Sequence, residues 1–399
     1  MKKILMVVDN EFTSDPRVYN EAKILVNNNF EVLVLCFNFS GHPGFEEKEG
    51  IRIHRLSISK TIKNYLFSSV NTIALYDLYW AFQIRKIIKQ FRPDFIHVHD
   101  LYMARSAGWA NKGRVKLIVD LHENYPAAVM SYNWAIKYPK RILAQPERWK
   151  KKEIKFLNFA DRIIVLSEDY RDFLINKYPI LKKENFVVYP NVPDIKELYS
   201  YGIDTNILKD DESRILFYFG GIAERRGVFT CFEAIKLLIA KGVKVKLLLI
   251  GPVDKADLPL FNNYLSDEII RSHTIHYPWK DISTLPSYVN KSFACLSPII
   301  KNEQHESGVA NKVFQYMLFE RPVIVSDCKP QESIIDKYSC GVVFKSGDAA
   351  DLAEKIQYLI NNPEESRSMG INGKKAVLNE YNIENYKLNL LNMYKSLIS

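Results

Sequence analysis

The sequence contains few cysteines and no long apolar run. Five of its 399 residues are cysteine, an odd number, and no two form a C-x-x-C pair. This content predicts a reducing compartment and argues against a disulfide framework or a structural zinc site. The apolar run Ile4–Val8 stops at Asp9, which predicts a first strand rather than a signal peptide. The segment 65–84 approaches membrane-spanning length but contains Asp77 and several polar residues, so we expect no membrane span and a cytoplasmic protein.

Length and composition indicate a globular protein with two domains. Hydrophobic residues make up 47% of the chain and charged residues 25%, as in soluble globular proteins rather than disordered or fibrous ones. A chain of 399 residues is too long for one core and suits two domains of ordinary size.

The formal net charge of +9 is concentrated in the segment 137–156. Between Lys137 and Lys155 there are eight cations against two acids, Glu147 and Glu153, with three aromatic residues interleaved: Tyr138, Trp149 and Phe156. One interpretation is a solvated helix face. The other is a patch for anionic lipid head groups, which predicts peripheral contact with the inner face of the cell membrane. No groove-reading motif accompanies the charge, so nucleic acid is not an expected partner.

Strand-like and helix-like segments alternate along the chain, as in βαβ units with a parallel sheet covered on both faces. The first half predicts strands at 3–8, 31–37, 51–56, 94–98, 116–119, 162–166 and 186–189, and a long aromatic-rich helix over 68–90. The polar segment 194–213 breaks this rhythm and predicts a domain boundary. The alternation then resumes, with a helix over 364–380 expected to break near Gly370 or Gly373, and a tail helix over 383–398. The predicted fold is two doubly wound α/β domains in tandem.

The loop 220–227, GGIAERRG, follows one predicted strand and opens a helix. Ligands of open parallel sheets bind beyond the carboxyl ends of the strands, so such loops carry the candidate residues. Gly220 and Gly221 let the backbone approach a ligand closely, and Arg225 and Arg226 suit phosphate oxygens. The alternative is a plain turn with surface arginines.

A second candidate loop lies in the stretch 305–327. The polar residues 306–308 lead into a helical pattern whose first turn contains Asn311 and Lys312, followed by the apolar run 322–325. A loop before a helix N-terminus directs backbone N–H groups at any anion bound there. An ordinary loop–helix–strand unit with a surface lysine is the alternative. Because both loops belong to one predicted domain, we favour a two-sided clamp for a diphosphate.

The histidines of the first half cluster near the ends of two predicted strands. The loop DLHEN, 120–124, places His122 at a strand's carboxyl end, with a capping role as the alternative to ligand contact. His97 and His99 alternate on the preceding strand, and we interpret His97 as packed and His99 or Asp100 as facing the crevice. The spacing matches no standard divalent site, so no metal is predicted.

Seven motifs occur in an order that carries a family resemblance: SDPRVYNEA (14–22), PDFIHVHD (93–100), DLHE (120–123), ADRIIVLS (160–167), YPN (189–191), GGIAERRG, and NKVFQYM followed by RPVIVSD. Together they resemble the retaining nucleotide-sugar glycosyltransferases of family four, which have the GT-B fold of two Rossmann-like domains facing across a cleft. The resemblance covers nearly the whole chain. It implies an acceptor-binding domain over 1–195, a nucleotide-sugar domain over 205–381, and a helix 382–399 that packs back on the first.

The same resemblance implies roles for single residues. Arg226 would grip the diphosphate, Lys312 and the amides after Gly308 would meet phosphate and sugar, and His122 would face the donor sugar. The expected catalytic residues are His122, Glu306 and Arg226. Expected donor-binding residues are Gly220, Gly221, Arg225, Arg226, Pro278, Trp279, Ser307, Gly308, Val309, Asn311, Lys312 and Gln315, and expected acceptor-side residues are Asp15, Arg17, Asp100 and Glu123. Pro278 and Trp279 would frame the nucleobase, with a core role for Trp279 as the alternative.

Three positions depart from the family pattern. The glutamate that typically holds the ribose hydroxyls is Gln315, whose amide can still hydrogen-bond a diol. The other family glutamate falls on Ser307, with Glu306 one residue early. The arginine usual after the first glycine of the diphosphate loop is Gly221, so Arg225 is the expected substitute.

The expected activity is transfer of a glycosyl unit, with retention, from a UDP- or GDP-linked sugar to an acceptor hydroxyl. The acceptor would be a glycan or a lipid-linked glycan in bacterial surface polysaccharide or glycolipid assembly. Neither a cofactor beyond the nucleotide sugar nor a metal is expected, because cations and helix N-termini would stabilise the leaving diphosphate. The alternatives are a non-catalytic sugar-nucleotide-binding subunit of the same fold and, less favoured by the loop motifs, a sugar-nucleotide epimerase.

Overall fold

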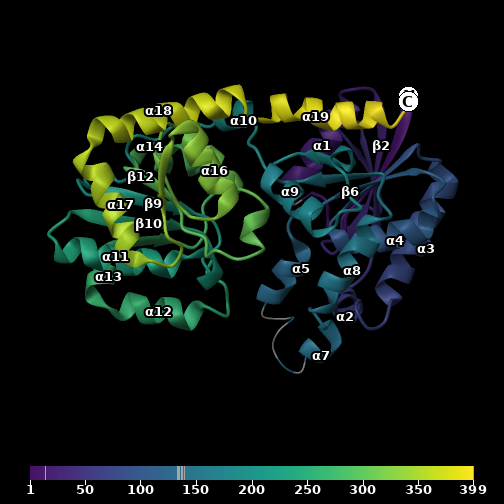
Figure 1. Ribbon diagram of the computed structural model, residues 1–399, viewed down its shortest axis with the longest axis horizontal. Helices are drawn as coiled ribbons and strands as arrows, with labels where there is room; N and C mark the ends of the chain where they lie inside the picture. Colours follow the sequence, from purple (N-terminus) through teal and green to yellow (C-terminus); the bar gives the residue numbers. More distant parts are fainter. Residues whose placement is uncertain (14, 133–134, 136–137, 139, 399) are drawn as a thin grey trace. The chain divides into compact units, whose positions relative to one another are not determined.

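The structure is a computed structural model that describes residues 1–399 except 14, 133–134, 136–137, 139 and 399. It divides the chain into two compact units, Met1–Pro190 with Lys387–Ser399, and Asn191–Tyr386 (Figure 1). The last helix, α19 (Ile383–Ser396), contributes residues to both units.

An eight-stranded sheet forms the centre of the first unit. Its strands are β1 (Lys2–Val7), β2 (Phe30–Asn38), β3 (Phe45–Lys48), β4 (Ile51–Ser57), β5 (Phe95–His99), β6 (Lys116–Asp120), β7 (Arg162–Val165) and β8 (Phe186–Val188). They lie in the order β3-β4-β2-β1-β5-β6-β7-β8, and every neighbouring pair is parallel except β3 with β4. The winding reverses between β1 and β5, and in doubly wound sheets ligands bind beyond the strand ends at such a point.

Helices cover both faces of this sheet. They are α1 (Pro16–Val26), α2 (Lys60–Ser68), α3 (Leu75–Phe91), α4 (Leu101–Asn111), α5 (Tyr125–Ala128), α7 (Lys140–Ala144), α8 (Arg148–Leu157) and α9 (Glu168–Lys177). On one face, α3, α4 and α8 bury apolar side chains such as Trp80, Ala107 and Trp149 against the strands. Helix α1 begins at Pro16, and Asp15 is its cap: the Asp15 carboxylate accepts a hydrogen bond from the Val18 amide.

The helix predicted over 68–90 is wrong at its start, because the structure has two helices, α2 and α3, there. The loop between them is held by its neighbours: Asn71 donates to the carbonyl oxygen of Ala144, and its own carbonyl oxygen accepts from Arg148 and Lys152. Because side chains of α8 satisfy this carbonyl oxygen, the chain can leave the helix here without an unpaired polar group.

The second unit contains a six-stranded sheet. Its strands are β9 (Arg214–Phe219), β10 (Val245–Ile250), β11 (Thr274–Tyr277), β12 (Ala294–Ser297), β13 (Val323–Ser326) and β14 (Gly341–Phe344), all parallel, in the order β11-β10-β9-β12-β13-β14. This is the strand order of a dinucleotide-binding Rossmann sheet, with the reversal between β9 and β12. The two parallel sheets confirm the predicted pair of doubly wound α/β domains.

The helices of this unit are α10 (Ile195–Ser200), α11 (Val228–Ala240), α12 (Leu258–Ser266), α13 (Glu268–Ser272), α14 (Leu285–Lys291), α15 (Asn311–Leu318), α16 (Lys329–Tyr338), α17 (Ala349–Asn361) and α18 (Pro363–Asn379). The expected break near Gly370 or Gly373 is wrong, since α18 is continuous. These glycines instead allow close packing: a Cβ at Gly370 would lie 2.2 Å from the carbonyl oxygen of Glu320, and one at Gly373 would lie 3.2 Å from Met317 side-chain atoms.

Candidate functional site

Two loops of the second unit meet at its topological reversal. The loop 220–227 follows β9, and the segment 298–310 follows β12. Their backbones touch: Gly227 has φ +72°, and a Cβ there would lie 1.7 Å from the carbonyl oxygen of Pro298. The amide of Ile300 also donates to the carbonyl oxygen of Arg225, at 3.1 Å. Glycine at position 227 is therefore required both by its left-handed backbone and by this contact.

Three cations from the two loops and α15 surround one small region. Arg225 and Arg226 lie in a short 3-10 turn, Glu224–Arg226, and Lys312 lies in the first turn of α15. Burial, together with the charges of Arg226, Arg225 and Lys312, lowers the pKa of the neighbouring His305 to about 4. Since His305 feels all three charges, the structure brings together the three cations that the sequence assigned to a diphosphate clamp.

Lys312 is the most enclosed of these cations. The residue is only 9% exposed, and its Nζ lies 3.6 Å from the centre of the Tyr218 ring. No carboxylate among the described residues forms an ion pair with it. Burial and then the charge of Arg226 hold the pKa of Lys312 well below its ordinary value. A buried ammonium without a carboxylate partner is a favourable place for an anionic ligand.

The loop before α15 uses several of its polar groups internally. The Ser307 hydroxyl donates to the carbonyl oxygen of Gln304 at 2.6 Å, and a carboxylate oxygen of Glu306 accepts from the amide of Lys329 at the start of α16. Gly308 is extended, with φ 178°, and Val309 joins the apolar core. Asn311 is exposed at the start of α15, and Gln315 is buried on the same helix.

Gly220, Pro278 and Trp279 lie at the ends of neighbouring strands. Gly220 follows β9 and has φ +132°. Pro278 and Trp279 follow β11 and are both exposed, Trp279 to 71%. The alternative of a core role for Trp279 is therefore wrong, because a buried tryptophan would lose most of its exposed surface.

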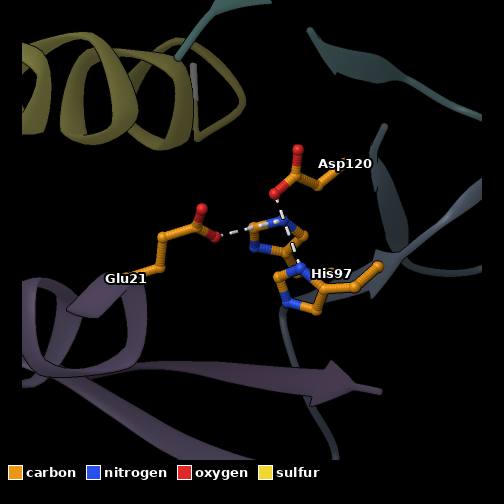
Figure 2. Close-up of side chains that lie close together, drawn as sticks. Glu21, His97 and Asp120 are labelled. Atoms are coloured by element: carbon orange, nitrogen blue, oxygen red, sulfur yellow. Dashed lines mark ion pairs between the residues drawn. The ribbon is translucent and has the colours of Figure 1, made fainter. Parts of the chain in front are cut away.

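The first unit contains a buried polar cluster close to its own reversal. The register pairs His99 of β5 with Asp120 of β6, so their side chains share a face of the sheet. Arg17 of α1 lies on that face: its Nε is 3.0 Å and its Nη2 2.9 Å from the two oxygens of Asp120, and its Nε is 3.2 Å from Glu21. Figure 2 shows Glu21, His97 and Asp120 pointing toward one another.

The three histidines of this region form a chain of contacts. His97 Nδ1 shares a hydrogen bond with the Tyr394 hydroxyl of α19 at 2.8 Å, and the His97 and His99 rings stack with centres 4.5 Å apart. His99 Nδ1 lies 3.1 Å from His122 Nε2, which is also 3.2 Å from Asp120. His97 is packed, as expected, and His99 is fully buried too, so of the two crevice candidates only Asp100 is partly exposed.

The titratable residues of this cluster have pKa values that are shifted in different directions. Burial opposes the charge of Asp120, but Arg17 and His122 hold its pKa well below the ordinary value. Burial and the charge of Asp120 raise the pKa of Glu21 well above its ordinary value. Although burial acts against it, the charges of Asp120 and Asp100 raise the pKa of His122 to about 9. The cluster therefore contains a charged His122 at neutral pH.

Glu21, His97, His99 and Asp120 are also residue types that bind divalent metals, with ligand atoms all within 4.8 Å of one another. However, the Arg17 guanidinium already occupies both oxygens of Asp120 and contacts Glu21. A divalent cation among these ligands would lie a few ångströms from that charge and would repel it. We therefore interpret the cluster as an arginine-neutralised hydrogen-bonding network.

The residues expected on the acceptor side have internal partners in the first unit. Asp15 caps α1, and Arg17 is bound by Asp120. Asp100 accepts from the Tyr102 hydroxyl at 2.9 Å and has φ +72°, a strained backbone typical of functional positions, and burial raises its pKa to about 7. Both oxygens of Glu123 accept from the Tyr132 hydroxyl.

Sequence reasoning missed Glu21, Tyr218 and Tyr394. Glu21 lies four residues after Arg17 on α1, and an acid beside the apolar stripe of that helix was the available signal. Tyr218 and Tyr394 fit the apolar patterns of their strand and helix. Hydrophobic periodicity does not show where a tyrosine hydroxyl forms its hydrogen bond, so the sequence did not single them out.

The two interpretations of the basic segment differ in where its aromatic residues lie. Under the lipid-patch interpretation Trp149 and Phe156 would face lipid, but they are 1% and 4% exposed and belong to the core, and Glu153 is buried against Lys177. Lys137 lies outside the described residues, whereas Arg148, Lys150, Lys151 and Lys155 are exposed on α8. Among the described residues, no helix is long and apolar enough to cross a bilayer.

Comparison with known proteins gives two matches to family descriptions. Residues 17–197 match Glycosyltransferase Family 4, and residues 203–376 match Glycosyl transferases group 1. The two ranges fall on the two units and together span most of the chain.

Curated relatives match parts of the chain. The capsular polysaccharide biosynthesis glycosyltransferase CapM of Staphylococcus aureus is 24% identical over 60% of this chain and 62% of its own length. A poly(ribitol-phosphate) alpha-N-acetylglucosaminyltransferase of Staphylococcus aureus (strain COL) is 22% identical over 62% of this chain and 47% of its own length. The chain thus aligns with about half to three fifths of these relatives' lengths.

Solved structures match over the full length. Sucrose-phosphate synthase from Thermosynechococcus elongatus has a TM-score of 0.77 at 16% identity, covering 100% of this chain and 99% of that one. Anabaena HepE in complex with UDP has a TM-score of 0.71 at 12% identity, covering 99% of this chain and 100% of that one. At these identities the likeness shows the fold alone. The chain belongs to the family four glycosyltransferases and has a GT-B type fold, as the two family matches, the seven motifs and the paired Rossmann-like sheets show.

Proposed function

We propose that this protein transfers a hexosyl unit, with retention, from a UDP- or GDP-linked sugar to an acceptor hydroxyl. The bond between the anomeric carbon and the β-phosphate oxygen breaks, and a bond from that carbon to the acceptor oxygen forms on the same face. The acceptor's proton passes to the departing diphosphate. No further cofactor takes part.

The observation that carries this proposal is the convergence of Arg225, Arg226 and Lys312 at the reversal of the second sheet. The leaving diphosphate gains negative charge as the glycosyl bond breaks. Cations held in place before the reaction stabilise that charge without reorganising. An arginine fork binds two phosphate oxygens at once, and a lysine acts as a point charge beside them.

The test uses Arg226→Ala, which removes one half-buried cation from the short turn. We expect the fold to remain intact and turnover to fall on the order of 100-fold or more, as removal of a single oxyanion donor does in other enzymes. Lys255→Ala, an exposed lysine of the same unit, is the matched control. Unchanged kinetics in Arg226→Ala would remove the diphosphate clamp from the proposal.

The alternative is a sugar-nucleotide-binding subunit without transferase activity. Two observations favour it: Gln315 replaces the family's ribose-binding glutamate, and Glu306 is engaged with the start of α16. Calorimetric binding of UDP or GDP, together with no donor hydrolysis and no transfer over a panel of acceptors, would support this alternative. Turnover with any donor would exclude it.

The acceptor is proposed to be a glycan or lipid-linked glycan of surface polysaccharide or glycolipid assembly. One of the curated relatives described above is named for capsular polysaccharide biosynthesis, and the other is named as a poly(ribitol-phosphate) alpha-N-acetylglucosaminyltransferase. A lipid-linked acceptor places the reaction at the inner face of the cell membrane, and the first unit offers a surface for such contact.

This surface, which we call the α2–α3 surface, consists of large apolar side chains exposed on neighbouring elements: Ile62, Tyr65, Ile73, Leu75, Leu78, Phe82 and Ile142. Leu75, Leu78 and Phe82 are spaced by three and four residues on α3, so they form one stripe along that helix. Exposed apolar groups gathered in this way mark interaction sites on otherwise polar proteins.

Exposed cations of α8 adjoin the α2–α3 surface. Arg148 and Lys152 donate to the carbonyl oxygen of Asn71, two residues before Ile73, and Asn71 also binds the end of α7. The labels α2, α7 and α8 lie together at one end of the first unit in Figure 1, and α2 contacts α7. Apolar side chains beside Lys and Arg are the combination that binds an anionic bilayer interface.

Vesicle sedimentation tests the membrane contact. The protein is expected to bind phosphatidylcholine vesicles only when they contain phosphatidylglycerol, and Lys150→Glu with Lys151→Glu should abolish that binding. Leu78→Ser with Phe82→Ser should weaken it without changing net charge. Lys241→Glu with Lys255→Glu changes net charge equally on the second unit and should have no effect. Equal binding to neutral vesicles, or none to either, would refute the electrostatic contact.

A further inference from the structure

Tyr218 occupies the position where the two halves of the diphosphate clamp meet. It is the next-to-last residue of β9 and only 1% exposed. Its ring belongs to the apolar core with Leu216, Val228 and Phe232. A phenylalanine would fill this space equally well, so the hydroxyl needs its own explanation.

The hydroxyl of Tyr218 binds the glycine loop. Its oxygen donates to the carbonyl oxygen of Gly221 at 2.7 Å, inside the loop that carries Arg225 and Arg226. Burial raises the pKa of Tyr218 above its ordinary value, so the group remains a neutral hydroxyl that can donate. Gly221 is exposed, and a Cβ added there would meet nothing within 4 Å. The hydroxyl thus restrains the loop at Gly221, where a side chain would find no packing neighbours.

The face of the same ring holds the lysine of the other half. Lys312 Nζ lies 3.6 Å from the ring centre, well inside the range of a cation–π contact. A carboxylate at this place would pair with the ammonium, whereas an aromatic face contacts Nζ without taking its hydrogen bonds. Burial and the charge of Arg226 lower the pKa of Lys312, so an anion bound beside it would favour the charged form.

A second tyrosine ties the same two elements at a neighbouring point. The Tyr316 hydroxyl of α15 accepts from the amide of Phe219 at 2.8 Å. The end of β9 and α15 are therefore joined both by this bond and by the contact of Tyr218 with Lys312. Tyr218 thus contacts both halves of the clamp: the glycine loop through its hydroxyl and Lys312 through its ring.

We propose that Tyr218 is a positioning residue for both halves of the clamp: its hydroxyl fixes the loop of Arg225 and Arg226, and its ring aims Lys312 at the same anion. This inference rests on the proposed function for the identity of the anion. It also makes a separate claim, that the two halves bind diphosphate cooperatively because they share one side chain. Tyr218 itself is not expected to touch the substrate.

Three variants separate the two contacts. Tyr218→Phe keeps the ring and removes the bond to Gly221, Tyr218→Leu removes both contacts, and Lys312→Met removes the charge while leaving the loop contact intact. Tyr358→Phe, which removes an exposed hydroxyl bound to Glu365 on α17 and α18, is the matched control for loss of a tyrosine hydroxyl. Denaturation curves confirm that each variant is folded before binding is measured.

Calorimetry with UDP and with inorganic pyrophosphate gives the first readout. Tyr218→Phe should weaken pyrophosphate binding roughly 3- to 10-fold, the size of one net hydrogen bond. Tyr218→Leu should weaken it by roughly a further 10-fold through loss of the desolvated cation–π contact. In the Lys312→Met background that further loss should vanish, because no cation remains over the ring. Equal binding by wild type and Tyr218→Leu, or an undiminished loss in the Lys312→Met background, overturns the inference.

Carbon-13 NMR of lysine side chains gives a readout that needs no ligand. A Cε beside Nζ above an aromatic face is shifted upfield by the ring current, so the Lys312 signal, assigned with Lys312→Met, should be displaced in wild type and Tyr218→Phe. It should return to the ordinary position in Tyr218→Leu. A Lys312 signal at the ordinary position in wild type refutes the ring contact even if the enzyme is active. If the Lys312 signal is shifted upfield but the protein binds none of UDP, GDP and pyrophosphate, the ring contact is supported and the proposed function is refuted.

Discussion

His122 Nε2 lies 3.1 Å from His99 Nδ1 and 3.2 Å from an Asp120 oxygen, so one edge of the His122 ring is turned into the first unit. The side chain as a whole is 19% exposed. Because Nε2 is engaged internally, Nδ1 is the nitrogen left for a substrate. The charged groups that act on this ring are Asp120, Asp100, His99, Arg17 and Glu21.

The pKa of His122 predicts how stability depends on pH. Its folded pKa of about 9 exceeds the ordinary 6.5, so the folded state holds this proton more tightly than the unfolded chain. The stabilisation is complete below pH 6.5 and is lost as pH rises to about 9. We expect the free energy of unfolding to fall by on the order of 1–3 kcal/mol over that window.

Urea denaturation at several pH values between 6 and 9.5 measures this fall. His122→Asn should flatten the profile in that window. Glu21→Gln is a useful comparison, since the raised pKa of Glu21 contributes in the same direction and its removal should leave the His122 component in place. A wild-type profile that is flat, or one that His122→Asn leaves unaltered, would contradict the charge assignment.

Tyr394→Phe tests the contact between α19 and β5. The change leaves His97 Nδ1 buried without its hydrogen-bond partner, which costs roughly 1–3 kcal/mol of folding free energy. Chemical denaturation gives the value. Tyr199→Phe removes a hydroxyl from a tyrosine that is 48% exposed on α10 and should change stability by less than about 0.5 kcal/mol. Similar losses in the two variants would show that the His97 contact contributes nothing.

Two glycines of the same loop should differ in how well they tolerate substitution by alanine. Gly227→Ala places a Cβ 1.7 Å from the carbonyl oxygen of Pro298 at φ +72°, so we expect destabilisation on the order of 2–4 kcal/mol or failure to fold. Gly221→Ala has open space around it and should fold normally, so any effect should be confined to donor binding. Thermal melting with and without UDP distinguishes the two. A stable Gly227→Ala protein would mean that the two loops do not meet as described.

Catalysis is expected to proceed in excess EDTA. In the proposed reaction the cations at the second sheet supply the positive charge for the leaving diphosphate, and in the first unit Arg17 already pairs with Asp120 and Glu21. Initial rates with and without EDTA, after removal of metal from the protein, should agree within about two-fold, far from the large losses that follow removal of a catalytic charge. Recovery of activity only on adding back a divalent ion would count against the metal-free scheme.

Much of the fold could be predicted because strands with continuous apolar runs, such as 214–219 and 323–326, follow each other at βαβ spacing. The pattern failed where tertiary contacts decide local structure. The α2–α3 break depends on side chains of α8 reaching Asn71, and the unbroken α18 depends on Gly370 meeting the backbone at Glu320. The antiparallel edge strand β3, FEEK, carries mostly charged residues and gave no strand signal.

The candidate site could also be predicted only in part. The loops carrying Arg226 and Lys312 were found because glycine, arginine and a helix start have local signatures. The aromatic residues of the basic segment were misplaced, since an interleaved Trp149 reads equally well as lipid-facing or core. The bonds from Tyr218 to Gly221 and from Tyr394 to His97 could not be predicted, because the second joins residues 297 apart and both depend on side-chain direction.

The tyrosine on α19 also constrains how the chain is made. Residues 2–190 supply all strands of the first sheet, yet the partner for His97 and the ring that covers Phe30 and Phe95 come from Tyr394, after the whole second unit in sequence. During synthesis, about two hundred further residues must therefore be added before Tyr394 can pack on the first unit. The ribosome adds roughly 5–20 residues per second. A chain stalled before α19 would leave Phe30, Phe95 and His97 without the ring and hydroxyl that Tyr394 provides.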